Sequence, residues 1–308
     1  MQKYSVFNLI KNAFTNHKDW EVAWKDPAPK SEYDVVIIGG GGHGLATAYY
    51  LAKEHNITNV AIIEKGWIGG GNVGRNTTII RSNYMHDENA LFSEFGMNLW
   101  RDMSQELNFN VMFSPRGIIN LAHSDAQMNV YSRRGNSMRL NGIDAVLLGR
   151  EEVKKIIPMA DFSENVRFPI FGGLMQPSGG TARHDGVAWG YARQADSMGV
   201  DIVQNCEVTG FDVVEGKIKG IRTSRGDIKT NKVGLCVAGS TSILAEKLNM
   251  TLPIETHLLQ ACVSEPIKPI LHNVVTFGAG HFYCSQSDKG EMVMGGDLDG
   301  YNSYAQRG

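Results

Sequence analysis

The chain has 308 residues, of which 42% are hydrophobic and 20% are charged, and its 30 basic and 32 acidic residues leave a formal net charge of −2. A chain of this length can bury a full core as one large or two interleaved domains. No basic block is longer than Arg133-Arg134 and no apolar run approaches the roughly 18 residues of a membrane span. We therefore expect neither nucleic acid nor a membrane as a partner.

Residues 1–30 predict a short helix followed by an arm. The proline-containing segment 26–32 interrupts regular structure in this arm. This amphipathic start lacks the continuous apolar core of a signal peptide. Strand, glycine turn, helix and strand are then expected over 33–42, 43–56 and 59–66, because a β-branched run ends in glycines before a helical pattern and a second apolar run. This order within about 30 residues predicts a βαβ unit.

The rest of the chain alternates helices and strands. We expect an amphipathic helix over 89–107, a strand over 116–124, a helix over 124–142 and a capped helical turn over 151–158. Residues 184–240 predict helix, strand, hairpin and strand, with turns at Glu215-Gly216 and Arg225-Gly226, and return to the same parallel sheet. Residues 252–308 alternate apolar and polar residues, as in an antiparallel sheet, and stop in mid-pattern.

The four cysteines lie 22 to 30 residues apart, which makes no metal-binding pair. Cys236, Cys262 and Cys284 lie in apolar runs, so together with Cys206 we expect free buried thiols in a reducing cytoplasm. No His, Asp or Glu cluster has the spacing of metal ligands, and we expect no metal.

The strongest chemical signal is Gly39-x-Gly41-x-x-Gly44, which follows a predicted strand and opens a predicted helix. Glycines there permit a tight turn, close approach of a pyrophosphate and close helix packing, and the helix N-terminus attracts phosphate. Glu64 ends the next strand, 20 residues after Gly44, where its carboxylate can accept hydrogen bonds from a ribose and would repel a 2′-phosphate. The pattern predicts a bound ADP moiety and argues against NADP.

The fingerprint alone leaves FAD and NAD both open. The following run, 66–84, is rich in Gly, Asn and Thr and carries Arg75 and Arg81. It offers backbone donors and hydroxyls to a flavin, although a solvated surface loop is the simpler interpretation of its spacing.

Four segments together resemble one group of flavoenzymes: YDVVIIGGGGHGLATAYYLAKEH, AIIEKGWIGGGNVGRNTTIIRSNY, GGTARHDGVAW and YNSYAQRG. The chain is similar, from about residue 18 to its end, to beta subunits of heterotetrameric sarcosine oxidases, in the glycine-oxidase and D-amino-acid-oxidase group. The resemblance implies an α/β fold in which a Rossmann-like FAD-binding domain (31–88 and 168–250) interleaves with an antiparallel-sheet substrate domain (89–167 and 251–308), after the helical arm 1–30. Members of the family continue for roughly a hundred further residues, so the sequence also suggests a truncated product.

The resemblance also implies the cofactor sites. Non-covalent FAD is expected at residues of the glycine turn, the 72–79 loop, a strand and a later small-residue turn: Gly39, Gly41, Gly42, His43, Gly44, Glu64, Asn72, Asn76, Thr77, Thr78, Ile79, Val208, Ala238 and Gly239. For Val208 an ordinary core valine explains the sequence nearly as well. His184 matches the family histidine that is joined covalently to FMN, with Asp185 as a neighbour that would orient the imidazole ring or keep it neutral.

Expected catalytic positions are Arg81, Thr78 and Tyr283. Arginine binds a carboxylate bidentately, and the related oxidases place one at the position of Arg81, although a structural salt bridge is the competing interpretation. His257 and His281 are weaker candidates.

The implied enzyme is a sarcosine oxidase that transfers a hydride from sarcosine to FAD. Electrons then pass through FMN to oxygen, giving hydrogen peroxide and glycine, and the formaldehyde unit passes to tetrahydrofolate. The implied partners are the alpha, gamma and delta subunits. Three alternatives stay open: a flavin amine oxidase or dehydrogenase for glycine, proline or dimethylglycine, a non-catalytic flavin-binding remnant, and an NAD-dependent dehydrogenase.

Overall fold

The structure, a computed structural model, describes residues 5–16, 18, 22–256 and 259–296. The chain divides into two compact units that interleave along the sequence. The first comprises Met1–Gly40, Gly44–Trp67 and Ala192–Gly234, and the second comprises Gly41–His43, Ile68–Tyr191 and Leu235–Gly308. The domain boundaries expected from the sequence differ from these limits and stay a prediction.

A four-stranded sheet, in the order β12-β1-β2-β8, forms the centre of the first unit. Its strands are β1 (Val35–Ile38), β2 (Val60–Ile63), β8 (Asp201–Val203) and β12 (Val233–Leu235). The β1–β2 and β2–β8 pairs are parallel, and every residue of β2 is buried, as a parallel strand requires. The expected βαβ unit, and the return of the later segment to its sheet, are confirmed.

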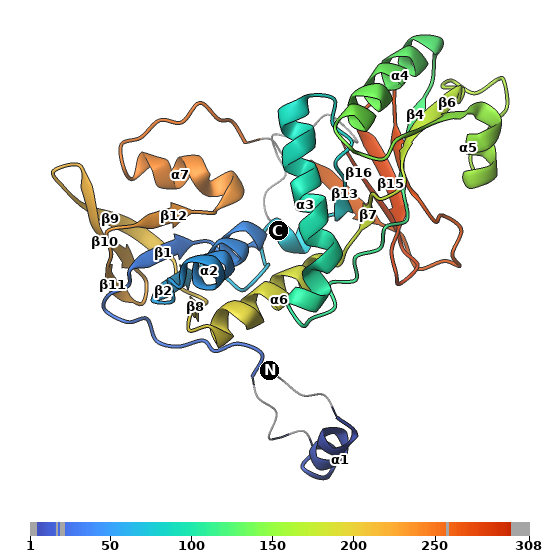
Figure 1. Ribbon diagram of the computed structural model, residues 1–308. Coiled ribbons are helices and arrows are strands. Elements are labelled where there is room, and N and C mark those ends of the chain that lie inside the picture. The colour runs from blue at the N-terminus through green and yellow to red at the C-terminus, as the bar shows by residue number, and fades with distance from the viewer. Residues whose placement is uncertain (1–4, 17, 19–21, 257–258, 297–308) are drawn as a thin grey trace. The chain divides into compact units, whose positions relative to one another are not determined.

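Helix α2 (Gly42–His55) connects β1 to β2 and lies beside these strands (Figure 1). It buries the face that carries Leu45, Ala48, Tyr49 and Ala52. The turn before it depends on Gly39, whose φ of 109° is open to glycine but strained for other residues. The Gly39 N–H donates to the carbonyl of Ile63 at 2.9 Å, which fixes the turn at the ends of both strands.

A three-stranded antiparallel sheet completes the first unit. Its strands are β9 (Val208–Val214), β10 (Lys217–Thr223) and β11 (Gly226–Lys229). Glu215, Gly216 and Gly226 all have positive φ values in the two connecting turns, at the positions that the sequence predicts.

Helix α1 (Val6–Phe14) has no buried residue, and Ser5 caps its N-terminus.

The second unit contains a seven-stranded sheet in the order β13-β16-β15-β14-β4-β6-β5. These strands are β4 (Ile118–Ala122), β5 (Val146–Gly149), β6 (Gly172–Gln176), β13 (Gln260–Val263), β14 (Val274–Phe277), β15 (Phe282–Gln286) and β16 (Met292–Gly296). The expected antiparallel pairing after residue 252 is confirmed over the described residues, and β14 additionally pairs in parallel with β4.

Strands β5 and β6 have no counterpart among the sequence expectations. Gly172 and Gly173 weaken the strand pattern of β6, but the sheet requires them, because a Cβ on Gly173 would lie 2.9 Å from the carbonyl oxygen of Asn120 on β4. The sequence assigns residues 168–250 to the FAD-binding domain. Strand β6 is part of that range, and in the structure it pairs within the seven-stranded sheet of the second unit.

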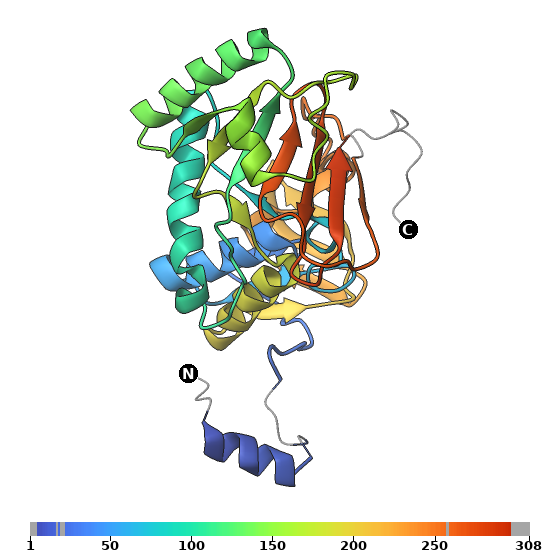
Figure 2. The same ribbon diagram turned by 90° about the vertical axis from the view of Figure 1, so that its right-hand side faces the viewer.

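Two helices, α4 (Asp125–Leu140) and α5 (Arg150–Ile156), pack against β5 and β6 of this sheet (Figures 1 and 2). Helix α3 (Asp87–Glu106) and helix α7 (Thr241–Glu246) belong to the same unit, as do the short 3-10 helices at Val73–Arg75 and Ala238–Ser240. Helix α6 (His184–Ser197) begins in the second unit and ends in the first. None of the helices that the structure describes is long and apolar enough to cross a membrane.

The cysteine expectation is wrong in part. All four cysteines are free, but Cys206 alone is buried, Cys236 and Cys284 are half-buried, and Cys262 is exposed. The reason is topological: β13, which carries Cys262, ends the seven-stranded sheet, so an apolar run there does not imply burial.

Candidate functional site

The glycine turn and Glu64 form a backbone cradle in the first unit. The Glu64 carboxylate accepts hydrogen bonds from the N–H groups of Gly40 at 2.7 Å and Gly66 at 2.8 Å. Glu64 is the first residue after the buried strand β2, and it is half-buried. Through its two hydrogen bonds the carboxylate connects the turn after β1 with the turn after β2. The expected carboxylate is therefore in place at the ends of both strands.

The residues present fit an ADP moiety. A Cβ on Gly41 or Gly42 would meet only the side chain of Val73, at 3.8 and 3.6 Å, so the backbone in front of helix α2 is open to an approaching group. The first N–H groups of a 14-residue helix lie at this position, and they suit a pyrophosphate. His43 is exposed beside them.

A cavity of about 1130 Å³ lies in the second unit. Its wall comes from five segments: residues 74–78, 110–116, 181–184, 259–263 and 285–293. This volume is slightly above the roughly 300–1,000 Å³ of ordinary ligand pockets, and it suits a large planar cofactor together with a small substrate.

Several residues that the sequence singles out meet at this cavity. Asn76, Thr77 and Thr78 line it from the loop before β3 (Ile79–Ile80), and His184 lines it from the start of α6. β3 pairs with β7 (Gly180–Thr181), so the two segments, about a hundred residues apart in sequence, are joined by backbone pairing. The structure thus brings the expected flavin loop and the expected flavin-linked histidine to one cavity.

Thr78 has a strained backbone. Its φ of 56° is in the left-handed region, which a β-branched residue rarely adopts. Its N–H donates to the side-chain oxygen of Asn76, and its carbonyl accepts from the N–H of Ala182 at 3.3 Å. Strain of this kind costs about 1–3 kcal/mol and concentrates at functional sites.

His184 is half-buried, and desolvation by burial lowers the pKa of its imidazole below the ordinary value. The imidazole is therefore neutral near pH 7, which is the form that can act as a nucleophile. The expected role of Asp185 is wrong: its carboxylate binds the Arg183 guanidinium at 2.8 Å and the Gly186 N–H at 2.8 Å, and its charge raises the pKa of His184 instead of holding the ring neutral.

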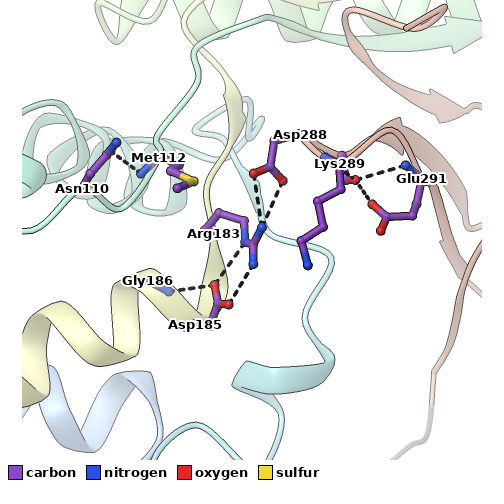
Figure 3. A network of polar contacts seen from close by, with 9 residues as sticks. Asn110, Met112, Arg183, Asp185, Gly186, Asp288, Lys289 and Glu291 are labelled. Atoms are coloured by element: carbon purple, nitrogen blue, oxygen red, sulfur yellow. Dashed lines mark hydrogen bonds and ion pairs between the residues drawn. The ribbon is translucent and has the colours of Figure 1, made fainter. Parts of the chain in front are cut away.

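Charged residues that sequence reasoning did not assign lie in the same wall. Arg116 is one of them. Arg183, Asp288 and Lys289, which Figure 3 shows, are others. Burial lowers the pKa of Arg116, whose guanidinium donates to the Gln286 carbonyl at 2.8 Å. The sequence gives a local signal for one of them, because Arg183 and Asp185 flank His184.

Other expected residues lie outside this cavity. Arg81 lines a smaller pocket of about 340 Å³ with Phe92, Phe95 and Trp100, donates to the Asn83 side chain at 2.8 Å and stacks over the Tyr84 ring at 4.7 Å.

Five further expected positions also lie outside this cavity, and one of them, Ala238, has its backbone in the left-handed region. Ile79 begins β3, Asn72 precedes a 3-10 helix, and Val208 is buried at the start of β9. Ala238 has a φ of 46°, and a Cβ on Gly239 would lie 3.0 Å from the methyl group of Thr256.

Of the weaker candidates, Tyr283 and His281 lie near each other, with ring centroids 6.3 Å apart, but neither lines the cavity. The Tyr283 hydroxyl occupies the space beside Gly295. His257 lies outside the described residues. Among the residues that the structure describes, no group of three or more His, Cys, Asp or Glu side chains can hold a metal ion.

Comparison with known proteins identifies a flavoprotein family and close relatives of the chain. Residues 34–307 match the family described as FAD dependent oxidoreductase. The chain is 60% identical to a sarcosine oxidase subunit beta of Rhizobium meliloti (strain 1021), over 99% of this chain and 73% of that protein. It is 52% identical to the protein of the same name from Rhodobacter capsulatus, over 100% of this chain and 74% of that protein.

Among solved structures, an L-proline dehydrogenase from P. horikoshii superimposes with a TM-score of 0.82 and 27% identity, over 90% of this chain and 73% of that one. A glycine oxidase from Bacillus cereus superimposes with a TM-score of 0.72 and 21% identity, over 85% of this chain and 70% of that one, and shares the fold.

Proposed function

Since the chain belongs to the family of FAD-dependent oxidoreductases, we propose that it is the beta subunit of a heterotetrameric sarcosine oxidase, which demethylates sarcosine oxidatively to glycine. The chain is an oxidoreductase by its close relatives, two of which are 60% and 52% identical and carry the name sarcosine oxidase subunit beta. The observation that carries the proposal is the meeting of the 76–78 loop and His184 at one large cavity.

The glycine turn and Glu64 would hold FAD without a covalent bond. The N–H groups at the start of α2 would bind the pyrophosphate, because they have no carbonyl partner within the helix. Glu64 already accepts from Gly40 and Gly66, and its carboxylate would also accept from the ribose hydroxyls. Val208, Ala238 and Gly239 would lie against the ADP moiety, as the resemblance implies.

His184 would hold FMN through a covalent bond. Its position on the cavity wall and its lowered pKa support this assignment, because a neutral imidazole has a free lone pair. Held at these residues, the two flavins would supply an acceptor for the hydride of the sarcosine N-methyl group and a route for the electrons to oxygen.

The protein would orient the substrate amine and keep water out of the cavity. Thr78, on its strained loop, would fix the flavin-side wall. The resemblance assigns the substrate carboxylate to Arg81 and a further substrate contact to Tyr283, although neither side chain lines the cavity. The products would be glycine, hydrogen peroxide and a one-carbon unit that passes to tetrahydrofolate. The partners in this proposal are the alpha, gamma and delta subunits.

A second candidate is oxidation of proline, which the superposition on the L-proline dehydrogenase favours. Both reactions remove a hydride from a carbon beside a secondary amine. They differ in the substrate that bleaches the bound flavin.

The experiment is peptide mass spectrometry on the chain co-expressed with alpha, gamma and delta subunits of a sarcosine oxidase. The tryptic peptide from His184 to Arg193 should carry the mass of FMN, and sarcosine, but not proline, should bleach the flavin absorbance. Bleaching by proline alone would establish the second candidate. An unmodified peptide in a preparation that holds FAD would indicate a single-flavin enzyme, and a preparation with no flavin at all would refute the proposal.

A further inference from the structure

Arg183, the residue directly before His184, bridges two carboxylates (Figure 3). Its Nε and Nη2 atoms donate to the two oxygens of Asp185 at 3.1 and 2.8 Å. Its Nη1 atom donates to both oxygens of Asp288 at 3.2 Å. The side chains of Arg183 and Asp185 are 25% and 26% exposed, so their bidentate ion pair is partly desolvated, whereas Asp288 is 43% exposed and its contact with Arg183 is closer to a solvated surface pair.

Both carboxylates lie on fixed elements. Asp185 is in the first turn of α6, where its carboxylate also accepts from the Gly186 N–H at 2.8 Å. Asp288 lies in the turn between β15 and β16, which closes through the hydrogen bonds from Ser287 N–H to the Glu291 carbonyl at 2.8 Å and from Gly290 N–H to the Ser287 carbonyl at 3.1 Å. The Arg183 side chain therefore ties the start of α6 to this turn.

The backbone before His184 is also held. The Arg183 N–H donates to the Val111 carbonyl at 2.9 Å, and the Ala182 N–H donates to the Thr78 carbonyl at 3.3 Å. These bonds set the position of the His184 backbone, while the guanidinium sets the charges around its imidazole.

Three charged groups act on that imidazole, and their effects oppose each other. The Asp185 carboxylate raises the pKa of His184, whereas Arg183 and Lys289, which extends from the β15–β16 turn, lower it. Because Arg183 binds both oxygens of Asp185, the negative charge of this carboxylate is compensated. The same contact lowers the pKa of Asp185, so the network stays charged near neutral pH.

We propose that Arg183 is a positioning residue for His184: by bridging Asp185 and Asp288 it compensates the Asp185 charge and holds the start of α6 in place for covalent attachment of the flavin to the imidazole. This inference rests on the proposed function. In the attachment, an imidazole nitrogen of His184 bonds to the 8α carbon of FMN, that carbon loses one hydrogen, and the imidazole loses its N–H proton. Both hydrogens, with the two electrons, leave in hydrogen peroxide formed from oxygen.

The test measures the rate of covalent attachment against pH, after FMN is added to the flavin-free complex, as flavin fluorescence that stays with the denatured chain. Arg183→Gln should slow attachment tenfold or more at pH 7 and move its pH dependence to higher pH, because the Asp185 charge is then uncompensated. Arg183→Lys should restore part of the rate and most of the pH dependence. Asp288→Asn should slow attachment less than Arg183→Gln does.

Arg101→Gln is the matched control, because Arg101 forms an exposed ion pair with Glu94 at 3.2 Å in the same unit. This variant should attach flavin as the unchanged protein does. An Arg183→Gln variant with the rate and pH dependence of the unchanged protein would overturn the proposal. The content of non-covalent FAD in each variant shows whether the fold is intact.

A second measurement separates this inference from the proposed function. Diethyl pyrocarbonate modifies neutral imidazole, so its rate on His184 against pH, read from chymotryptic peptides of the flavin-free full chain, gives the protonation midpoint. This midpoint should be higher in Arg183→Gln than in the unchanged chain and in Arg101→Gln. If the unchanged protein forms no flavin adduct, the covalent FMN of the proposed function fails, while an unmoved midpoint refutes the role of Arg183 by itself.

Discussion

Replacement of Gly41 by alanine tests where the pyrophosphate lies. A Cβ at this position would meet only the Val73 Cγ2 atom, at 3.8 Å, which is ordinary van der Waals contact. Gly40→Ala is the contrasting variant, because a Cβ at this position would lie 3.0 Å from the Cβ and 3.1 Å from the Cγ of Glu64 and would disturb the chain itself. The two adjacent glycines therefore differ in what the chain itself tolerates.

The expected magnitudes follow from these contacts. For the flavin-free protein, Gly41→Ala should change the free energy of unfolding by less than about 1 kcal/mol. The methyl group fits in the folded state, and alanine lowers the conformational entropy of the unfolded chain. Gly40→Ala should destabilise it by about 1–3 kcal/mol, because Glu64 must move and its 2.7 Å hydrogen bond from Gly40 is disturbed. If the methyl group added in Gly41→Ala costs two charge-assisted hydrogen bonds to phosphate, worth roughly 3–4 kcal/mol together, FAD binding should weaken more than about 100-fold.

The assay has two parts. Quenching of flavin fluorescence on titration of the flavin-free protein gives the dissociation constant for FAD, and urea denaturation of the same preparation gives the free energy of unfolding. Gly41→Ala should lose affinity and keep stability, whereas Gly40→Ala should lose stability. A Gly41→Ala protein that binds FAD as tightly as the unchanged protein would refute the placement of the pyrophosphate over this turn.

Three further predictions are read from urea denaturation or from bleaching of the bound flavin by sarcosine. Glu64→Gln should lose one charge-assisted hydrogen bond and about 2 kcal/mol of unfolding free energy, and an unchanged urea midpoint would contradict this. Arg81→Ala should raise the sarcosine concentration for half-bleaching of the flavin at least tenfold, by loss of a carboxylate contact; an unchanged value would direct attention to Arg116 in the cavity wall. Burial raises the pKa of Tyr33 to about 12 from 10.0, so the neutral phenol, which donates to Asp201 at 2.9 Å, stabilises the fold below pH 10. That stability, of order 2 kcal/mol, should disappear as pH rises from about 10 to about 12, and Tyr33→Phe should show no such loss in urea denaturation across this range.

The local signals in the sequence were sufficient for the nucleotide-binding part of the fold. A β-branched run, a glycine that requires positive φ and an amphipathic helix define β1, the turn and α2 from neighbouring residues alone. The hairpin turns at Glu215-Gly216 and Gly226 were predictable for the same reason, because their backbone angles depend on the residue at that position.

The seven-stranded sheet was predictable only in part. Strand β6 pairs with β4 and β5, and its glycines are set by the close approach of those neighbours and not by any strand propensity of its own. The exposure of Cys262 likewise depends on the place of β13 at the end of the sheet order, which the residues around it do not encode.

The sequence by itself therefore determined the βαβ unit, the glycine cradle with Glu64 and, through the resemblance, the flavoenzyme family. Only the tertiary structure shows that Thr78 and His184 line one cavity and that Arg81 lines a separate pocket. It alone also shows that Arg183 binds Asp288, which is 105 residues away in the chain. The physical reason is that backbone angles and helix starts depend on adjacent residues. The charges around His184 depend instead on the β15–β16 turn, which is distant in sequence and contacts Arg183 only in the folded chain.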